Sequence, residues 1–316
     1  MPGLIECVPN FSEGRRNFGG CPALPVRLIR SRHGSTDAQD LSGTLFVVAV
    51  PIGNPDDLSA RARETLASAA VVAAEDTRHF ATLVRHHGIE TRAVSYHDHN
   101  AESRTRELIG RLTGGEDVAL VSDAGTPLVS DPGYRLVRAS IDAGIRVTSI
   151  PGPSAVTTAL AASGLPPHPF RFIGFLPRSK AARRSAFEAV ASDPATLVAF
   201  EAPRRLTDAL RDALAILGDR PACLARNLTK PHERYQRGSL SQLIAELEAE
   251  GEVRGECTLV IGGSPGRIGP SEEAEADARL LLAGGAPNRA VQDLLVARHG
   301  LSKRDAYALV LRVRDA

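Results

Sequence analysis

Residues 118–133 read Val118-Ala-Leu-Val-Ser-Asp-Ala-Gly-Thr-Pro-Leu-Val-Ser-Asp-Pro-Gly133, and this stretch decides the fold. The apolar run Val118–Val121 predicts a strand buried on both faces, and a helix is predicted from about Gly133 to Ala143. The loop between them holds two Asp, two Pro and two Gly within 11 residues. Ligands of open α/β sheets bind outside the carboxyl ends of the strands, so this loop favours a ligand site over a plain capped turn.

Strands and helices alternate on both sides of this loop, from Thr44 to Ile150. Such alternation predicts an α/β fold with a mostly parallel, doubly wound sheet. The predicted strands are residues 45–50, 71–74, 91–95, 118–121 and 146–150, and the predicted helices are residues 56–69, 77–87, 102–112 and 133–143.

A second α/β region begins after Pro151-Gly-Pro153 and a helix over residues 154–162, with a hinge at Gly164–Pro169. Its predicted strands are residues 170–174, 196–200, 222–227 and 257–262, and its predicted helices are residues 180–191, 204–216 and 240–249. A linker at Ser264–Pro270 then precedes three short predicted helices, at about residues 271–284, 287–298 and 302–315.

The pattern therefore predicts two α/β domains, at residues 43–164 and 165–264, and a helical extension at residues 271–316. Residues 1–42 are rich in Gly, Pro, Arg and Ser and show no periodicity, which predicts a disordered or spurious extension. Residues 1–16 resemble the opening of the glutamate formiminotransferases, but they are too few to hold a catalytic domain.

The overall charge is nearly balanced, with 38 Lys and Arg against 37 Asp and Glu. The balance conceals a difference between the two halves. Residues 43–169 carry 11 basic and 14 acidic residues, whereas residues 170–237 carry 13 basic and 7 acidic ones. The resulting +6 suits contacts with nucleic-acid phosphates, above all at Arg178–Arg184, although charged runs are also typical of plain solvent-facing surfaces.

Several absences exclude other classes of protein. Cys7, Cys21, Cys223 and Cys257 lie far apart with no C-x-x-C pair, which argues against a disulfide framework or a Cys-rich zinc site and suits the cytoplasm. No apolar run approaches 18 residues, so no membrane span is predicted. Residues 43–170 lack G-x-G-x-x-G, and no P-loop ending in G-K-[ST] occurs, which argues against dinucleotide binding and nucleotide hydrolysis.

Two more polar segments follow predicted strands, Ala74-Glu-Asp-Thr-Arg78 and Ser95-Tyr-His-Asp-His-Asn100. Both are expected at the sheet edge where ligands bind, which makes them candidates for catalysis. An H-x-H pair in a strand places both rings on one face but supplies no further ligands, so a base role is favoured and no metal site is predicted. For Glu75, Asp76 and Arg78 the alternative is a helix cap with an ion pair.

Eight segments in order match a known pattern: Val48–Asn54, Ala73–Arg78, Ser95–Asn100, Val121–Gly133, Ile150–Ala155, Ser163–Pro166, Gly174–Pro177 and Ala225–Lys230. From Leu45 to about Gly263 the chain resembles the bacterial 16S rRNA cytidine 2′-O-methyltransferases of the RsmI family, in the tetrapyrrole methylase superfamily. Residues 271–316 resemble, less specifically, the C-terminal helical extension of this family.

The resemblance implies a two-domain, class III methyltransferase fold with a small C-terminal helical extension, S-adenosylmethionine as cofactor in the cleft between the domains, and a homodimer. The implied cofactor contacts of the first domain are Pro51, Ser122, Asp123, Ala124, Gly125, Thr126, Pro127, Leu128, Ser154 and Ala155. Those of the second domain are Arg226, Asn227, Thr229, Glu256, Cys257 and Thr258.

The implied partner is 16S rRNA in the 30S subunit. Together with the basic second half, this predicts RNA-binding residues at Arg178, Lys180, Arg183, Arg184 and Lys230. The chain departs from the family pattern at Arg204, where His is usual, and at Asn227, where Glu is usual. The resemblance therefore implies no role that requires a His at position 204 or a Glu at position 227.

Methyl transfer to a ribose 2′-hydroxyl benefits from a positioned base, because the hydroxyl is a poor nucleophile near pH 7. The candidate bases are Asp76, His97 and His99, with Glu75 and Arg78 as orienting groups, and the sequence does not choose among them. Three alternatives stay open: a methyltransferase for a tetrapyrrole or another small molecule, a non-catalytic RNA-binding module with a methylase fold, and a formiminotransferase.

Overall fold

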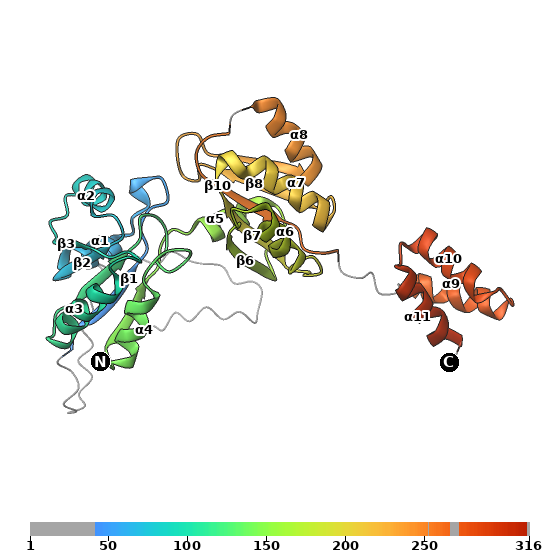
Figure 1. Cartoon of the computed structure of the whole chain (residues 1–316), viewed down its shortest axis with the longest axis horizontal. Coiled ribbons are helices and arrows are strands. Elements are labelled where there is room, and N and C mark those ends of the chain that lie inside the picture. The colour runs from blue at the N-terminus through green and yellow to red at the C-terminus, as the bar shows by residue number, and fades with distance from the viewer. Residues whose placement is uncertain (1–41, 252, 266–271, 315–316) are drawn as a thin grey trace, which may run out of the picture. The chain divides into compact units, whose positions relative to one another are not determined.

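The computed structural model describes residues 42–251, 253–265 and 272–314 (Figure 1). Residues 1–41 lie outside the described residues, and with them lie most of the predicted extension and the whole segment that resembles formiminotransferases. Most of the predicted linker at 264–270 also lies outside them.

The first sheet is fully parallel, with the strand order β3-β2-β4-β1-β5. Strands β2 and β4 are continuous apolar runs with every residue buried, which is typical of parallel strands covered on both faces. The parallel, doubly wound sheet predicted from the sequence is therefore confirmed. The strands are β1 (Thr44–Val48), β2 (Val71–Ala74), β3 (Ala93–Ser95), β4 (Val118–Val121) and β5 (Arg146–Ile150).

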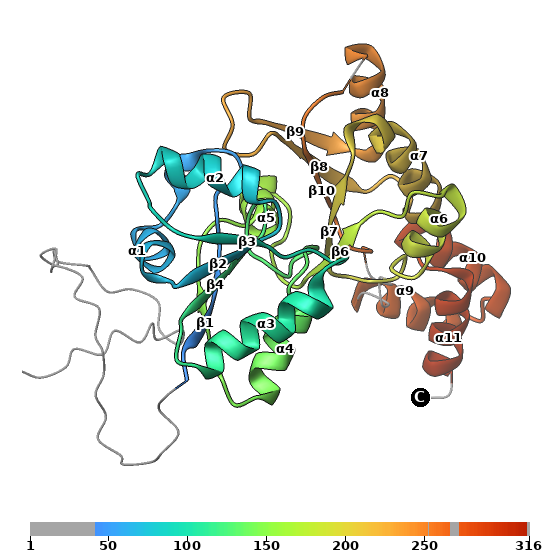
Figure 2. The ribbon, with the colours of Figure 1, turned by 60° about the vertical axis from the view of Figure 1, so that its left-hand side comes forward.

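Helices cover both faces of this sheet (Figure 2). On one face, α1 (Ala60–Ser68) and α2 (Thr77–His86) pack against β1, β2 and β4. On the other, α3 (Ala101–Thr113) and α4 (Tyr134–Asp142) cover the alternate residues of the same strands. A short 3-10 helix (Pro55–Asp57) precedes α1.

The second sheet is mixed, with the order β6-β7-β10-β8-β9. Only β6 and β7 are parallel, and the other neighbours are antiparallel. Helices α6 (Lys180–Glu188), α7 (Leu206–Leu217) and α8 (Leu240–Glu250) cover one face, whereas α5 (Ala155–Ser163) packs on the other. The strands are β6 (Phe170–Phe175), β7 (Thr196–Glu201), β8 (Pro221–Arg226), β9 (Arg234–Ser239) and β10 (Cys257–Ile261).

Strand β9 has no counterpart among the predicted elements. Its sequence, Arg234-Tyr-Gln-Arg-Gly-Ser239, lacks an apolar run because the strand lies at the edge of the sheet and pairs only with β8. An edge strand has little to bury, so no hydrophobic period marks it.

Three further helices agree with the predicted extension: α9 (Glu272–Ala283), α10 (Asn288–His299) and α11 (Lys303–Arg314). They share a small apolar core of their own, which includes Ala278, Leu295 and Val310. None of the helices in the described part of the chain is long and apolar enough to cross a membrane.

Candidate active site

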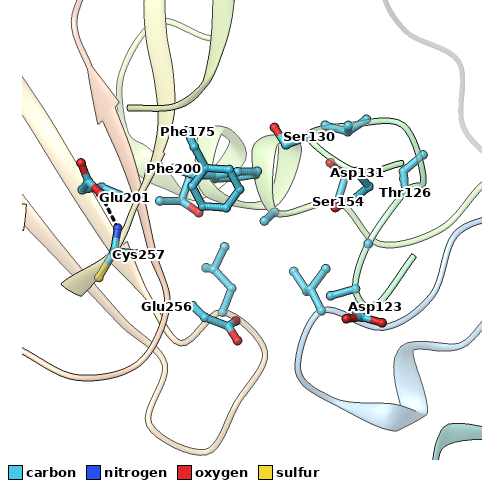
Figure 3. Close-up of a pocket in the computed structure, with 18 of the residues that line it drawn as sticks. Asp123, Thr126, Ser130, Asp131, Ser154, Phe175, Phe200, Glu201, Glu256 and Cys257 are labelled. Carbon is cyan, nitrogen blue, oxygen red and sulfur yellow. Dashed lines mark hydrogen bonds between the residues drawn. The ribbon is translucent and has the colours of Figure 1, made fainter. Parts of the chain in front are cut away.

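A cavity of about 450 Å³ opens at the carboxyl ends of β2 and β4 and faces the ends of β7 and β10 of the second sheet (Figure 3). It is therefore built on the sheet edge that the sequence predicted for a ligand site. The lining residues are Ile52, Glu75, Asp123, Ala124, Gly125, Thr126, Val129, Ser130, Asp131, Ser154, Ala155, Phe175, Phe200, Glu201, Ala202, Pro203, Leu228, Gly255, Glu256, Cys257 and Thr258.

The loop after β4 is held against the loop after β1 by two backbone hydrogen bonds. The Val50 N–H donates to the Gly125 carbonyl over 2.9 Å, and the Gly125 N–H returns a bond to Val50 over 3.0 Å. Gly125 has a φ of 76°, a conformation that favours glycine. A Cβ at this position would also lie 3.3 Å from Ile52, so glycine lets the two loops meet at the floor of the cavity.

A second close approach joins the loop after β1 to the loop after β8. The Asn54 N–H donates to Thr229 Oγ1 over 2.9 Å. A Cβ on Gly53 would lie 2.6 Å from the Leu228 carbonyl oxygen, which leaves no room for any larger residue there. The segment Pro51–Asn54 thus links the first sheet to the part of the cavity wall that Leu228 forms.

Backbone strain is concentrated in the loop after β4 and the loop after β8. Leu128, Ser130, Asn227 and Thr229 have φ values of 73°, 70°, 53° and 63°, and they are the non-glycine residues of the described chain in the left-handed region. Such conformations cost about 1–3 kcal/mol each and gather at ligand sites. The backbone of these two loops therefore forms the cavity in conformations that lower the stability of the fold.

The cavity has two chemically different ends. Figure 3 shows Asp123 and Asp131 on one side and Glu201 and Cys257 on the other, with the ring of Phe200 between them. Glu75 joins the first group, since the Asp123 N–H donates to Glu75 Oε2 over 3.3 Å. The end with Glu75, Asp123 and Asp131 is thus acidic, whereas the other combines Glu201 and Glu256 with apolar side chains such as Leu228.

The acidic end holds two carboxyl groups with raised pKa values. Burial raises the pKa of Asp131 to about 6, and the nearby charges of Glu75 and Asp123 add to this rise while a hydrogen bond from Ser122 opposes it. Burial also raises the pKa of Glu75. A carboxylate that titrates near neutral pH is suited to accept a proton, as catalytic bases do.

The predicted catalytic residues divide into one that lines the cavity and four that do not. Glu75 is the lining residue. Asp76 caps α2, accepts from the Arg78 N–H over 2.8 Å and forms an ion pair of 2.7 Å with the Arg78 guanidinium, which holds the pKa of Asp76 well below its usual range. The helix cap and ion pair that are the alternative for Asp76 and Arg78 are therefore present, and a carboxylate held in this way is a weak base.

His97 and His99 follow β3, which ends at Ser95, so they lie in the polar segment that was predicted after this strand. Their ring centroids are 5.9 Å apart, and the His97 N–H donates a hydrogen bond to Asn100 Oδ1 over 2.9 Å. Neither lines the cavity. The described residues contain no group of three or more His, Cys, Asp and Glu side chains placed to hold a metal ion.

The predicted cofactor contacts also divide. The cavity wall includes Asp123, Ala124, Gly125, Thr126, Ser154, Ala155, Glu256, Cys257 and Thr258. The other predicted contacts lie outside the lining set: Pro51, Ser122, Pro127, Leu128, Arg226, Asn227 and Thr229. Arg226 is buried and donates to Glu250 over 2.7 Å, and Thr229 bonds Asn54, so both have structural partners instead.

Eleven lining residues were not predicted as site residues: Ile52, Val129, Ser130, Asp131, Phe175, Phe200, Glu201, Ala202, Pro203, Leu228 and Gly255. Several belong to segments that the sequence had already singled out, such as Asp131 in the loop after β4 and Phe175 in Gly174–Pro177. The signal was present, but only the folded chain shows that these residues share one cavity.

The predicted RNA contacts require one correction. Arg183 is buried in the second α/β region, and its guanidinium donates to Asp212 Oδ2 over 2.9 and 2.6 Å, with both side chains 6% exposed. It is therefore a core ion pair and not a surface contact, so the prediction is wrong for Arg183. Arg178 and Lys180 are exposed, Arg184 lies at the rim of the same pair, and Lys230 pairs with Glu256 over 2.8 Å.

The donor set of this cavity fits S-adenosylmethionine. The carboxylates of Glu75, Asp123 and Asp131 are placed to attract its positive sulfonium and ammonium groups. At the other end, the apolar side chains of Phe200 and Leu228 offer a surface for a flat purine ring.

Comparisons with known proteins agree with this geometry. Residues 44–244 match the family model of the tetrapyrrole (corrin/porphyrin) methylases. The chain is 52% identical to "Ribosomal RNA small subunit methyltransferase I" of Micromonospora olivasterospora, over 85% of this chain and 87% of that protein. It is 41% identical to the protein of the same name from Escherichia coli O157:H7, over 87% and 96% of the two chains.

Among solved structures, diphthine synthase superposes with a TM-score of 0.56 at 19% identity, over 70% of this chain and 90% of that one, which shows a shared fold. The two-sheet architecture and the C-terminal helices agree with the fold class predicted from the sequence. The chain belongs to the tetrapyrrole (corrin/porphyrin) methylase family and, within it, to the family of ribosomal RNA small subunit methyltransferase I proteins.

Proposed function

We propose that this protein transfers a methyl group from S-adenosylmethionine to the 2′-hydroxyl of a cytidine ribose in 16S rRNA of the small ribosomal subunit. The observation that carries the proposal is the similarity, over most of the chain, to relatives named for methylation of small-subunit ribosomal RNA. The lining of the cavity supports it, because carboxylates suit the positive groups of the cofactor and apolar side chains such as Phe200 and Leu228 suit its purine ring.

When bound, S-adenosylmethionine supplies an electrophilic methyl group on a sulfonium. The protein's part is to bring the ribose oxygen in line with that methyl and to remove the hydroxyl proton. Asp131 accepts this proton, since its pKa of about 6 leaves it mostly ionised near neutral pH and still basic enough to take up a proton. Glu75, also with a raised pKa, shares the acidic end and accepts a hydrogen bond from the Asp123 N–H.

The exposed basic residues of the second half, Arg178 and Lys180 among them, contact rRNA phosphates. We assign the cofactor half to residues 43–164, the second methylase half to residues 165–264 and the helical extension to residues 271–316. We further propose that the protein is a homodimer that acts in the cytoplasm, where its ribosomal substrate is found.

Transfer of a labelled methyl group to ribosomal subunits tests the proposal. Subunits are purified from a strain that lacks the gene and are incubated with the protein and S-adenosyl[methyl-³H]methionine. The label is expected in 16S rRNA of the small subunit, and the large subunit serves as the control. Label in neither subunit, with transfer to a tetrapyrrole instead, would overturn the proposed substrate.

A further inference from the structure

One large apolar side chain at the cavity is exposed. Phe175 is 60% exposed, although it lines the cavity and ends strand β6. An exposed aromatic ring on a pocket wall indicates a surface that is covered when a ligand binds. Aromatic residues form only 4% of the chain, which argues against a large stacking platform, but a single stacking ring requires no such abundance.

The ring is held in place by a short aromatic series. Phe172 and Phe175 both contact Phe200, with ring centroids 4.9 and 5.2 Å apart and both pairs edge to face. Residues three apart in a regular strand point to opposite faces. Here the register shifts between Phe172 and Phe175, and Gly174 has a φ of 73°, so a bulge turns Phe175 to the face that Phe172 already occupies.

The bulge also places Phe175 beside the acidic end of the cavity. A Cβ on Gly174 would lie 3.7 Å from Ser130 Oγ, so the end of β6 approaches the loop that carries Asp131. Figure 3 shows Phe175 and Ser130 as neighbours across the top of the cavity. Phe175 and Asp131, the proton acceptor of the proposed function, thus belong to the same end of the cavity.

We propose that Phe175 stacks on the base of the target nucleotide and so positions its ribose hydroxyl at Asp131. Single-stranded RNA bases are commonly bound by stacking on aromatic side chains, and an enzyme that acts on one nucleotide must separate it from its neighbours. The inference rests on the proposed function. It makes Phe175 a positioning residue for the RNA substrate, and not a contact of the cofactor.

Steady-state kinetics with small subunits from the deletion strain test this role. Loss of one base–aromatic stack is expected to raise the KM of Phe175→Ala for the subunit about 10- to 100-fold. The Kd for S-adenosylhomocysteine, measured by calorimetry, is expected to stay unchanged. Phe175→Trp keeps a stacking ring and is expected to restore a KM near that of the wild type. Phe170→Ala is the matched control, since Phe170 is also exposed on β6 but does not line the cavity.

Fluorescence separates the base of the RNA from the adenine of the cofactor. The chain has no Trp, so Phe175→Trp introduces a single tryptophan whose emission can be excited selectively, and Phe170→Trp gives its control. S-adenosylhomocysteine is expected to leave the emission of both variants unchanged. Strong quenching of Phe175→Trp alone by S-adenosylhomocysteine would show that adenine stacks there and would overturn the inference.

An unchanged KM in a folded Phe175→Ala variant would overturn it equally. These outcomes differ from failure of the proposed function, in which the wild-type protein itself methylates no small subunit. Because Phe175 is exposed, its replacement is expected to leave the thermal unfolding temperature close to that of the wild type.

Discussion

Replacing Asp131 with Asn separates the catalytic and structural consequences of the acidic end of the cavity. Burial raises the pKa of Asp131 from 3.8 to about 6, so the charged form is less stable in the folded protein than in the unfolded chain. The rise corresponds to about 3 kcal/mol of destabilisation at high pH. Because the side chain is only half-buried, solvent screening reduces this to about 1–2 kcal/mol.

The sign of the effect depends on pH. Above pH 6 Asp131 is ionised in both states and the folded protein bears the full destabilisation, whereas below about pH 4 the group is protonated in both states and the effect disappears. Asp131→Asn, which is neutral throughout, is therefore expected to be more stable than the wild type by about 1–2 kcal/mol at pH 7.5. The advantage is expected to shrink as the pH falls to 5.

Urea denaturation at pH 7.5 and pH 5 measures the difference in the free energy of unfolding between Asp131→Asn and the wild type. A methyl-transfer assay measures the loss of turnover in the variant. Turnover of Asp131→Asn is expected to fall about 100-fold or more, with the Kd for S-adenosylhomocysteine little changed. The control is Asp142→Asn, which removes an exposed carboxylate of α4 away from the cavity. A variant that is less stable than the wild type at pH 7.5, or one that keeps full turnover, would refute the reasoning.

Two further predictions concern the basic residues. Asp212→Ala leaves Arg183 buried without its partner and is expected to lower the free energy of unfolding by about 3–5 kcal/mol, as measured by chemical denaturation. Joint replacement of Arg178, Lys180 and Arg184 by Ala is expected to raise the KM for the small subunit without changing the affinity for S-adenosylhomocysteine. The slope of log KM against log salt concentration is expected to fall by about 2, because three phosphate contacts are lost. An unchanged slope would count against these contacts.

The order and type of most elements could be predicted from the sequence, because buried strands such as Val118–Val121 are continuous apolar runs and their helices begin at clear signals. Ser59, for example, caps α1 through a hydrogen bond from the Ala62 N–H. The edge strand β9 could not be predicted, since a strand with one neighbour and polar faces shows no period.

The site could be predicted only in outline. Loop residues such as Asp123 and Gly125 were found because they follow a buried strand at the ligand-binding edge. Sequence position could not separate Glu75, which reaches the cavity, from its neighbour Asp76, which caps a helix. Nor could it show that Arg183, in a basic run, has a buried carboxylate partner 29 residues away in Asp212.

The approach of Phe175 to the cavity also depends on the folded chain. A bulge at Gly174 and a contact with Phe200 of the neighbouring strand aim the ring, and both are products of strand pairing. Such contacts join residues that are distant in sequence, and a single sequence carries no direct signal for them.

The identity of the methylated nucleoside tests the central claim most directly. Small subunits from the deletion strain are treated with the protein and S-adenosylmethionine, and their 16S rRNA is digested to nucleosides for mass spectrometry. A gain of 2′-O-methylcytidine, absent when Asp131→Asn replaces the wild type, is the predicted result. A gain of a base-methylated nucleoside, or no gain from a protein that binds the cofactor, would contradict the account.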